Sequence, residues 1–254
     1  MDDHALLELA VRLAAEAGSV ILDIRASGFA VQRKDDASIV TAADHAAEAV
    51  IVAGLRQAAP DLPVVAEEEV AAGRQTDLGD AYWLVDPLDG TREFAAGHDE
   101  FVVNIGLVRG HQAVLGAVYI PATGEMFGGI LGQGAWKQDS AGRRAIAART
   151  EPAEGLVVLA SRSHNNNAKL TEFLEGRRVA RTANYGSAVK FCRIAEGVAD
   201  LYPRFGRTME WDTAAPQAVV EAAGGHVRRL DGTQLTYGKP DYENPGFVCS
   251  GRDA

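Results

Sequence analysis

The chain has 254 residues, of which 47% are hydrophobic, and it carries a formal net charge of −10 at pH 7. A chain of this length can bury a sizeable core, as one large domain or as two halves of shared build. The negative charge argues against a protein that follows the phosphates of a nucleic acid, because such binding needs a basic face. It does not exclude a small anionic substrate that is held through a bound cation.

The cysteine content and the N-terminus indicate the cellular compartment. Cys192 and Cys249 form no disulfide framework and lack the spacing of a zinc site, so we expect two reduced thiols. The N-terminus, which begins Met1-Asp2, has no basic region followed by an apolar stretch, as a secretory signal would. No apolar run is long enough to cross a bilayer. We therefore expect a soluble, cytoplasmic protein with no integral membrane segment.

In chain order, the first half is expected to begin with helices and to continue as strands. The spacing of apolar residues predicts helices from Ala5 to Arg25 and from Thr41 to Leu55, with Thr41 as an N-cap. Short apolar runs bounded by turn residues predict strands. The expected strands are Phe29–Arg33, Leu62–Ala66, Tyr82–Val85, Phe101–Val108, Ala113–Ile120 and a hairpin from Met126 to Trp136.

The second half alternates between the two kinds of element. Strands are expected at Leu156–Ala160 and Phe247–Cys249, and helices at Asn167–Leu174, Ser187–Ala199 and Ala214–Ala223. Two glycines after the last helix form a good C-cap signal. This order favours layered sheets and helices over a simple doubly wound sheet. We expect one catalytic domain over residues 1–254, with an N-terminal half of about 1–150 and a C-terminal half of about 151–254.

The stretch Asp86-Pro87-Leu88-Asp89-Gly90-Thr91 follows an apolar strand directly. Strand ends that face a crevice are where α/β proteins place their chemistry. Gly90 lets the backbone approach a ligand closely, and carboxylates are oxygen ligands of the kind that Mg²⁺ takes together with substrate phosphates. The stretch therefore indicates a magnesium-phosphate site, although a solvated turn explains it equally well when it is taken alone.

Other acids change that balance. Glu67 also follows a buried strand, Asp212 begins a helix of small residues, and Asp44 lies near the start of another helix. Taken singly, these acids are ordinary: a surface glutamate, an N-cap and an exposed first-turn aspartate. Several strand and helix ends now offer carboxylates, and none has a basic partner beside it in the sequence. A shared cation site is therefore favoured.

These segments resemble a known family. Residues 86–94, Asp-Pro-Leu-Asp-Gly-Thr-Arg-Glu-Phe, and residues 211–215, Trp-Asp-Thr-Ala-Ala, are similar to the two signatures of the inositol monophosphatase superfamily, which comprises Mg²⁺-dependent, typically lithium-sensitive phosphatases. Residues 100–105, 161–164, 186–192 and 201–205 resemble its bacterial 3′(2′),5′-bisphosphate nucleotidase branch, the CysQ type. The resemblance runs over almost the whole chain. It implies conversion of adenosine 3′,5′-bisphosphate, the leftover of sulfate activation, to AMP and phosphate.

The resemblance also implies a layered α-β-α-β-α sugar-phosphatase fold, with two sheets between helix layers. It implies two Mg²⁺ ions and leaves room for a third, weaker one near Glu67. Thr91, with Asp44 behind it, would orient and deprotonate the attacking water. The implied metal ligands are Glu67, Asp86 and the Leu88 carbonyl for the first ion, and Asp86, Asp89 and Asp212 for the second. The implied substrate contacts are Gly90, Thr91, His164, Ser187, Lys190, Arg204 and Asp212.

Some points stay open. The Lys190 ammonium can bind phosphate as a point charge, and the Arg204 guanidinium can bind it through two parallel hydrogen bonds. Without the resemblance, both would be ordinary solvated residues. Pro216 replaces a glycine of many relatives and is expected in the first turn of its helix, where it adds bulk and weighs against an inositol ring. The resemblance favours Glu67 among the three consecutive glutamates, and whether Glu68 or Glu69 also contacts a metal stays open.

Three alternatives compete with the nucleotidase interpretation. The first is a phosphatase of the same superfamily that acts on inositol monophosphate or a sugar phosphate. The second is a haloacid-dehalogenase-type phosphatase, but its nucleophilic aspartate normally stands two residues before the next one, whereas Asp86 and Asp89 are three apart. The third is a cation-binding regulator without activity, which the full set of acids disfavours. The expected partner is a small bisphosphorylated nucleotide and not a nucleic acid, and the oligomeric state is open.

Overall fold

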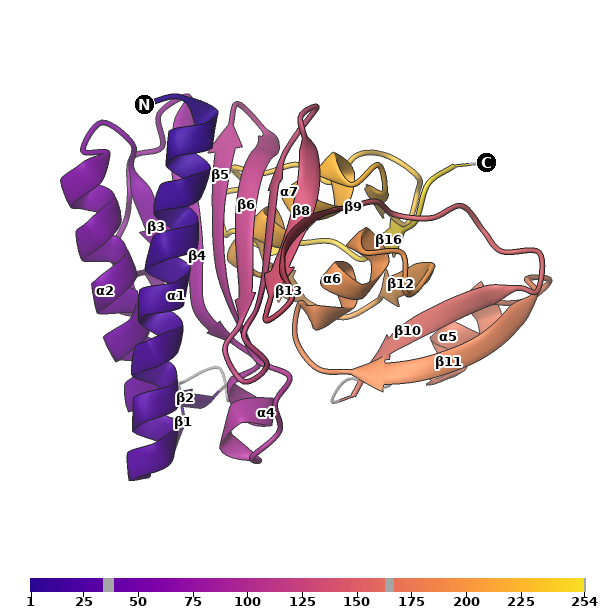
Figure 1. Cartoon of the computed structure of the whole chain (residues 1–254), viewed down its shortest axis with the longest axis horizontal. Helices are drawn as coiled ribbons and strands as arrows, with labels where there is room; N and C mark the ends of the chain where they lie inside the picture. The colour runs from indigo at the N-terminus through magenta and orange to yellow at the C-terminus, as the bar shows by residue number, and fades with distance from the viewer. Residues whose placement is uncertain (34–38, 163–166, 254) are drawn as a thin grey trace.

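The computed structural model describes residues 1–33, 39–162 and 167–253, which form alternating layers of helix and sheet (Figure 1). Helices α1 (Asp3–Ser27) and α2 (Ala42–Ala58) cover one face of a large sheet. Helices α6 (Val189–Ala195) and α7 (Glu210–Ala222) fill the space between this sheet and a smaller one. Helix α5 (Asn167–Phe173) packs on the outer face of the smaller sheet. The predicted layered α-β-α-β-α fold is thus confirmed.

The large sheet has the strand order β3-β4-β5-β6-β7-β8-β9 within the described residues. The first pair is parallel and the others are antiparallel. Its central strands are buried on both faces because helices cover each side. The strands are β3 (Val64–Ala66), β4 (Ala81–Asp89), β5 (Val102–Arg109), β6 (Gln112–Ile120), β7 (Glu125–Ile130), β8 (Gly134–Asp139) and β9 (Gly142–Ile146).

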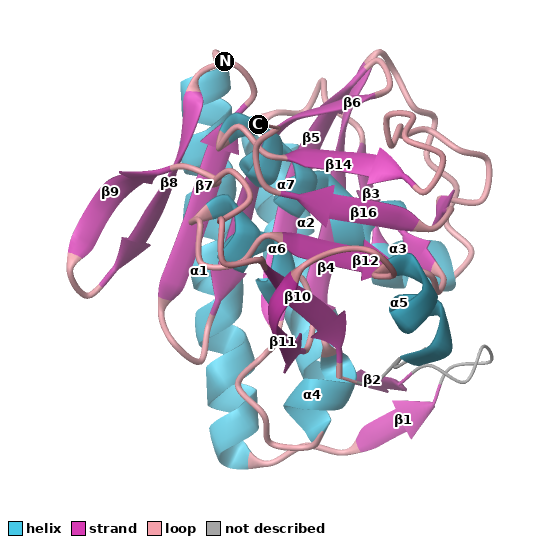
Figure 2. Cartoon of the chain, turned by 90° about the vertical axis from the view of Figure 1, so that its right-hand side faces the viewer, coloured by secondary structure: helices cyan, strands magenta, loops and turns pink. Residues whose placement is uncertain are grey.

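The smaller sheet has the order β11-β10-β12-β16-β14, and Figure 2 shows several of its strands running across the direction of the large sheet. Its strands are β10 (Leu156–Ser161), β11 (Val179–Tyr185), β12 (Leu201–Arg204), β14 (His226–Arg229) and β16 (Phe247–Ser250). Short strand pairs and helices complete the chain. They are β1 (Val31–Arg33) with β2 (Ile39–Thr41), β13 (Thr208–Met209) with β15 (Glu243–Asn244), α3 (Glu67–Ala71) and α4 (Thr91–Ala95).

Most predicted elements are present, with shifted ends. Thr41 is the N-cap of α2 as predicted, and its side chain accepts a hydrogen bond from the backbone of Ala43. The helix expected over Ser187–Ala199 is wrong at both ends. It stops at Ala195 because Gly197 adopts a positive φ of 75°, and Val198 is therefore exposed instead of sharing the buried face. In the described part of the chain, no helix has the length and apolar character that crossing a membrane requires.

Helix α7 lies directly on the large sheet because the strands beneath it carry glycine. A methyl group added to Gly106 in β5 would stand 2.6 Å from the backbone nitrogen of Ala215, and one added to Gly116 in β6 would also meet that residue's backbone. Gly129 in β7 likewise faces the Cα atom of Val219, at 2.9 Å from an added methyl. With no side chain between helix and sheet, the N-terminus of α7 is held close to β4 and β5.

This contact gives a stability prediction. Gly106→Ala should lower the free energy of unfolding by about 1–3 kcal/mol, because the added methyl meets backbone that can move only with the whole helix. Urea unfolding checks it. Gly79→Ala is the control, because an atom added there comes no closer than 3.9 Å to the carbonyl oxygen of Ala81. Equal stability of the two variants would contradict the prediction.

Candidate active site

Strand β4 carries the first two acids of the site. Asp86 and Leu88 are each only 1% exposed, which excludes a solvated turn. The pairing of β4 with β5 becomes irregular between Asp86 and Asp89, and Gly90 follows in a left-handed conformation with φ 92°. Helix α4 then starts at Thr91. The strand end therefore bends, and it places a second carboxylate three residues after the first.

The acids of this region raise one another's pKa. Burial raises the pKa of Asp86 well above its usual value, and the carboxylates of Glu67, Asp89 and Asp212 raise it further. Burial also raises the pKa of Asp212 to about 8, with Asp89 as the next cause. Carboxylates that repel one another in a buried site are stabilised by a bound cation. The donor set therefore fits a hard divalent cation with oxygen ligands.

The acids are not gathered into a compact cluster. Among the described residues, no three histidine, cysteine, aspartate or glutamate side chains meet in a ready metal-binding geometry. Instead, Asp89 Oδ2 accepts hydrogen bonds from the Ser187 hydroxyl at 2.8 Å and the Ala188 amide at 2.6 Å. Asp212 Oδ2 accepts one from the Met209 amide at 2.8 Å. These bonds occupy Oδ2 in both residues and leave Oδ1 outside them.

The three consecutive glutamates have different surroundings. Glu69 pairs with Arg56 at 2.6 Å and with Arg74 at 3.2 Å, so its charge is already balanced. The backbone amide of Glu68 donates to the Glu48 carboxylate at 2.7 Å, and both of these side chains are buried. Glu67, at the start of α3, is the one whose charge raises the pKa of Asp86 and Asp212. Its position supports the expected choice of Glu67.

Asp44 and Thr91 lie together, as their predicted pairing requires. The Thr91 hydroxyl oxygen is 3.0 Å from Asp44 Oδ1 and 3.1 Å from the Leu88 carbonyl oxygen. Asp44 is only 3% exposed, so it is not the exposed first-turn acid of the ordinary explanation. Its Oδ2 atom accepts hydrogen bonds from the Thr41 amide and hydroxyl, which fastens it to the start of α2. Burial raises the pKa of Asp44 despite these bonds.

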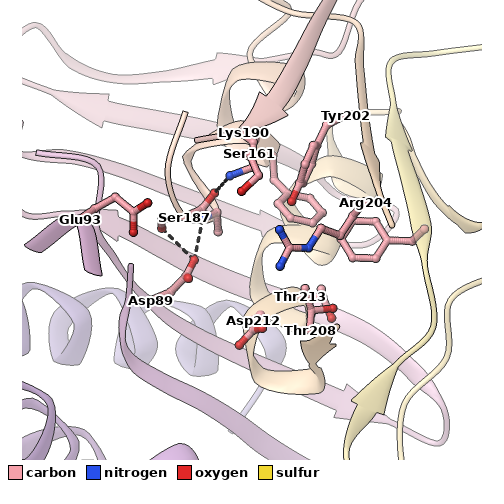
Figure 3. A pocket seen from close by; sticks show the side chains of 13 residues that line it. Asp89, Glu93, Ser161, Ser187, Lys190, Tyr202, Arg204, Thr208, Asp212 and Thr213 are labelled. Carbon is pink, nitrogen blue, oxygen red and sulfur yellow. Dashed lines mark hydrogen bonds between the residues drawn. The ribbon is translucent and has the colours of Figure 1, made fainter. Parts of the chain in front are cut away.

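A pocket of roughly 480 Å³, counting the space open to solvent, lies between the end of β4, the segment before α6, the start of α7 and strand β12 (Figure 3). Acids stand on one side of it and cations on the other. It is lined by Asp89, Glu93, Ser161, Ser187, Ala188, Lys190, Phe191, Tyr202, Arg204, Thr208, Asp212, Thr213 and Phe247.

The two cations of the pocket differ in how they are engaged. Lys190 is 2% exposed, and its ammonium donates to the carbonyls of Tyr185 and Ser187. Burial lowers the pKa of Lys190 to about 8, against the opposing effect of the Asp89 carboxylate. Arg204 donates to the carbonyl of Arg207, and its buried Nε has no partner. No carboxylate among the described residues forms an ion pair with Arg204, so its charge remains available to a bound anion.

Helix α7 begins earlier than predicted. Asp212 is the third residue of the helix and Pro216 the seventh, so the prediction that Pro216 lies in the first turn is wrong. The start at Glu210 is stabilised by Asp212, whose carboxylate accepts a hydrogen bond from the Met209 amide. A proline has no N–H, so the Asp212 carbonyl lacks its usual partner four residues on.

Several pocket residues were not predicted as site residues. Glu93 and Tyr202 fall inside segments that carry the resemblance, which was the available signal, whereas Phe247 comes from a predicted strand to which no site role was given. Glu100 accepts a hydrogen bond from the Gly186 amide at 2.7 Å and pairs with Arg162, so it shapes the segment before α6. The predicted contact His164 lies outside the described residues.

The chain belongs to the inositol monophosphatase family, whose model matches residues 2–253. It is 44% identical, over 245 residues, to the 3′(2′),5′-bisphosphate nucleotidase CysQ of Salmonella typhimurium. The aligned region covers 95% of this chain and 98% of that protein. The crystal structure of CysQ from Bacteroides thetaiotaomicron has a TM-score of 0.81 at 33% identity, with 98% of this chain and 97% of that one covered. The structure of an inositol monophosphatase from Anabaena has a TM-score of 0.78 at 27% identity, and the match covers 98% of this chain and 91% of that one.

The two hydrogen bonds that Asp44 accepts from the Thr41 amide and hydroxyl lead to a stability prediction. Asp44→Ala should lower the free energy of unfolding by about 1–2 kcal/mol, because α2 loses its capping interaction. Urea unfolding without added Mg²⁺ measures this loss. Asp2→Ala serves as the control, because Asp2 caps α1 through a single exposed bond to the Ala5 amide at 2.8 Å. A loss for Asp44→Ala no greater than that of the control would contradict the prediction.

Proposed function

We propose that this chain is a Mg²⁺-dependent 3′(2′),5′-bisphosphate nucleotidase, which hydrolyses adenosine 3′,5′-bisphosphate to AMP and phosphate and serves sulfate assimilation. The observation that carries the proposal is the pocket itself. It places Asp89 and Asp212, which are partly buried, in one pocket with Arg204, whose guanidinium forms no ion pair within 4 Å among the described residues. A substrate with two phosphates can use both sides at once. The similarity to CysQ nucleotidases over nearly the whole chain supports the same substrate class.

The acids would hold the metal ions. In the proposal, Glu67, Asp86 and the Leu88 carbonyl hold one Mg²⁺, Asp86, Asp89 and Asp212 hold a second, and a third binds weakly near Glu67. Bound Mg²⁺ neutralises the phosphate and lowers the pKa of a water molecule.

The protein groups around the acids position the reactants. Thr91 lies within hydrogen-bonding distance of Asp44, so the pair can orient a water molecule and pass its proton to the carboxylate. The raised pKa of Asp44 makes its carboxylate a stronger base than an exposed aspartate. The amides of Gly90 and Thr91 would hold the reacting phosphate.

The other phosphate would meet the cations. Arg204 presents a guanidinium fork suited to two phosphate oxygens. Lys190 lines the same pocket, but its two carbonyl bonds leave it one further N–H to donate, so we assign it the smaller share. Ser187 lies beside Lys190, and His164 would approach the base. We place the enzyme in the cytoplasm, acting on small molecules and not on nucleic acid.

Inositol monophosphate is the second candidate substrate, because a protein from Anabaena with the same fold is named an inositol monophosphatase. Phosphate release from adenosine 3′,5′-bisphosphate and from inositol 1-phosphate should be compared at equal concentrations in Mg²⁺. A strong preference for the nucleotide supports the proposal. Preference for the inositol ester would overturn the substrate assignment while leaving the metal site in place.

Asp89→Asn should reduce kcat by at least about a thousandfold, because a metal ligand loses its negative charge while side-chain size is kept. Steady-state phosphate release from adenosine 3′,5′-bisphosphate measures the loss, and circular dichroism checks the fold. Asp99→Asn is the matched control, because Asp99 is a surface acid whose side chain is 68% exposed. Turnover within tenfold of the wild type in the Asp89 variant would refute the role.

Arg204→Met should raise KM for adenosine 3′,5′-bisphosphate by about 10–100-fold, since hydrogen bonds to charged groups contribute about 1.5–3 kcal/mol. The KM for inositol 1-phosphate should hardly change, because that ester has no second phosphate. Arg207→Met, at a surface arginine that pairs with Glu243, is the control. A parallel rise for both esters would count against Arg204 as the contact to the second phosphate.

A further inference from the structure

Asn104 in β5 is a fully buried polar residue next to the proposed cation site. It is 0% exposed, and it stands directly opposite Asp86 in the pairing of β4 with β5. Directly opposed residues of an antiparallel pair have Cβ atoms about 5 Å apart, on the same face of the sheet. Its partner on the other side, in β6, is the apolar Val118. Asp86 is thus the polar side chain that the sheet places beside Asn104.

The shared face is the one that α7 covers. Val103 and Ile105, the neighbours of Asn104, pack in the cluster formed with α1 and α2, so Asn104 points to the opposite face. Gly106, two residues on, lies against Ala215 of α7. Asn104 therefore faces the layer in which α7 carries Asp212.

The Asn104 amide has no hydrogen-bond partner at either of its side-chain atoms. Among the described residues, it is the one buried side chain that lacks a partner at both a donor and an acceptor atom. Leaving such groups unpaired costs about 1–3 kcal/mol each, so native proteins retain them where another molecule completes them. The amide does not bond Asp86 directly, although the two residues face each other. A bridging atom between them would satisfy both.

We infer that Asn104 is a positioning residue of the cation site, which binds the hydration water of a divalent cation and steadies the Asp86 carboxylate through it. Asp86 Oδ1 already accepts a hydrogen bond from the Leu88 amide at 3.0 Å, so one carboxylate oxygen is fixed by the end of its own strand. The amide can donate to Asp86 or accept from a water molecule, because it carries both functions. The inference rests on the proposed function, since Asp86 is a proposed Mg²⁺ ligand.

The test uses Asn104→Leu, which keeps the size of the side chain and removes its polar atoms. The Mg²⁺ dissociation constant, measured calorimetrically on the full chain without substrate, should rise about 10–100-fold, the usual effect of losing a group that orients metal ligands. The Tm of the metal-free protein should stay equal or increase, because an unpaired amide has gone. Asn104→Ala, measured in the same way, serves if the leucine variant does not fold.

Tyr82→Phe is the matched control. Tyr82 lies on the same face of β4, four residues before Asp86, and its buried hydroxyl also lacks a partner. Its loss should leave Mg²⁺ binding unchanged. An unchanged Mg²⁺ dissociation constant in the folded Asn104 variants would overturn the inference and leave the proposed function standing. Absence of Mg²⁺ binding by the wild type would instead overturn the cation site, and the inference with it.

Discussion

The contact between α7 and the large sheet is the constraint on which the site depends. Glycines in β5, β6 and β7 leave no side chain between the helix and the strands, so the helix backbone lies against the sheet. The start of α7 is thereby brought beside the end of β4. An acid more than a hundred residues later in the chain, Asp212, then shares a buried environment with Asp86. The chemistry of the site follows from this packing.

The charge distribution of the site is uneven by construction. Buried acids raise one another's pKa on the β4 side, and the positive charges of Lys190 and Arg204 stand across the pocket (Figure 3). Carboxylates that repel one another favour the binding of a divalent cation, whereas the side chains of Lys190 and Arg204 favour the binding of an anion. A substrate that brings phosphates together with Mg²⁺ balances both sides, which a neutral ligand cannot do. The net negative charge of the chain therefore does not oppose an anionic substrate.

The sequence allowed the layered fold and most elements to be predicted, because apolar periodicity and turn residues are local. The pairing of Thr91 with Asp44 was also predicted, through the resemblance, and the structure brings the two together. The edge strands β9 and β11 were missed, because their largely exposed residues lack an apolar pattern. The start of α7 was placed too late, because the capping role of Asp212 lies inside the helix and not before it.

The partners of individual polar atoms could not be predicted, because they depend on segments far apart in the chain. Lys190 is an example: its sequence position suited a phosphate contact, yet the structure directs its ammonium to two backbone carbonyls. Asn104 is another, since a residue inside an apolar strand gives no local sign that it faces Asp86. The stretch that carries the acids was visible in the sequence, whereas the residues that orient them were not.

The hydrogen bonds from Ser187 and Ala188 to Asp89 connect the segment before α6 to the end of β4. Both bonds go to Oδ2, so a cation bound at Oδ1 and a substrate that rests on residues 186–188 would act on the two oxygens of one carboxylate. The two ligands would therefore be thermodynamically linked through this side chain. Whatever factor the cation imposes on the affinity for substrate, the substrate must impose on the affinity for the cation.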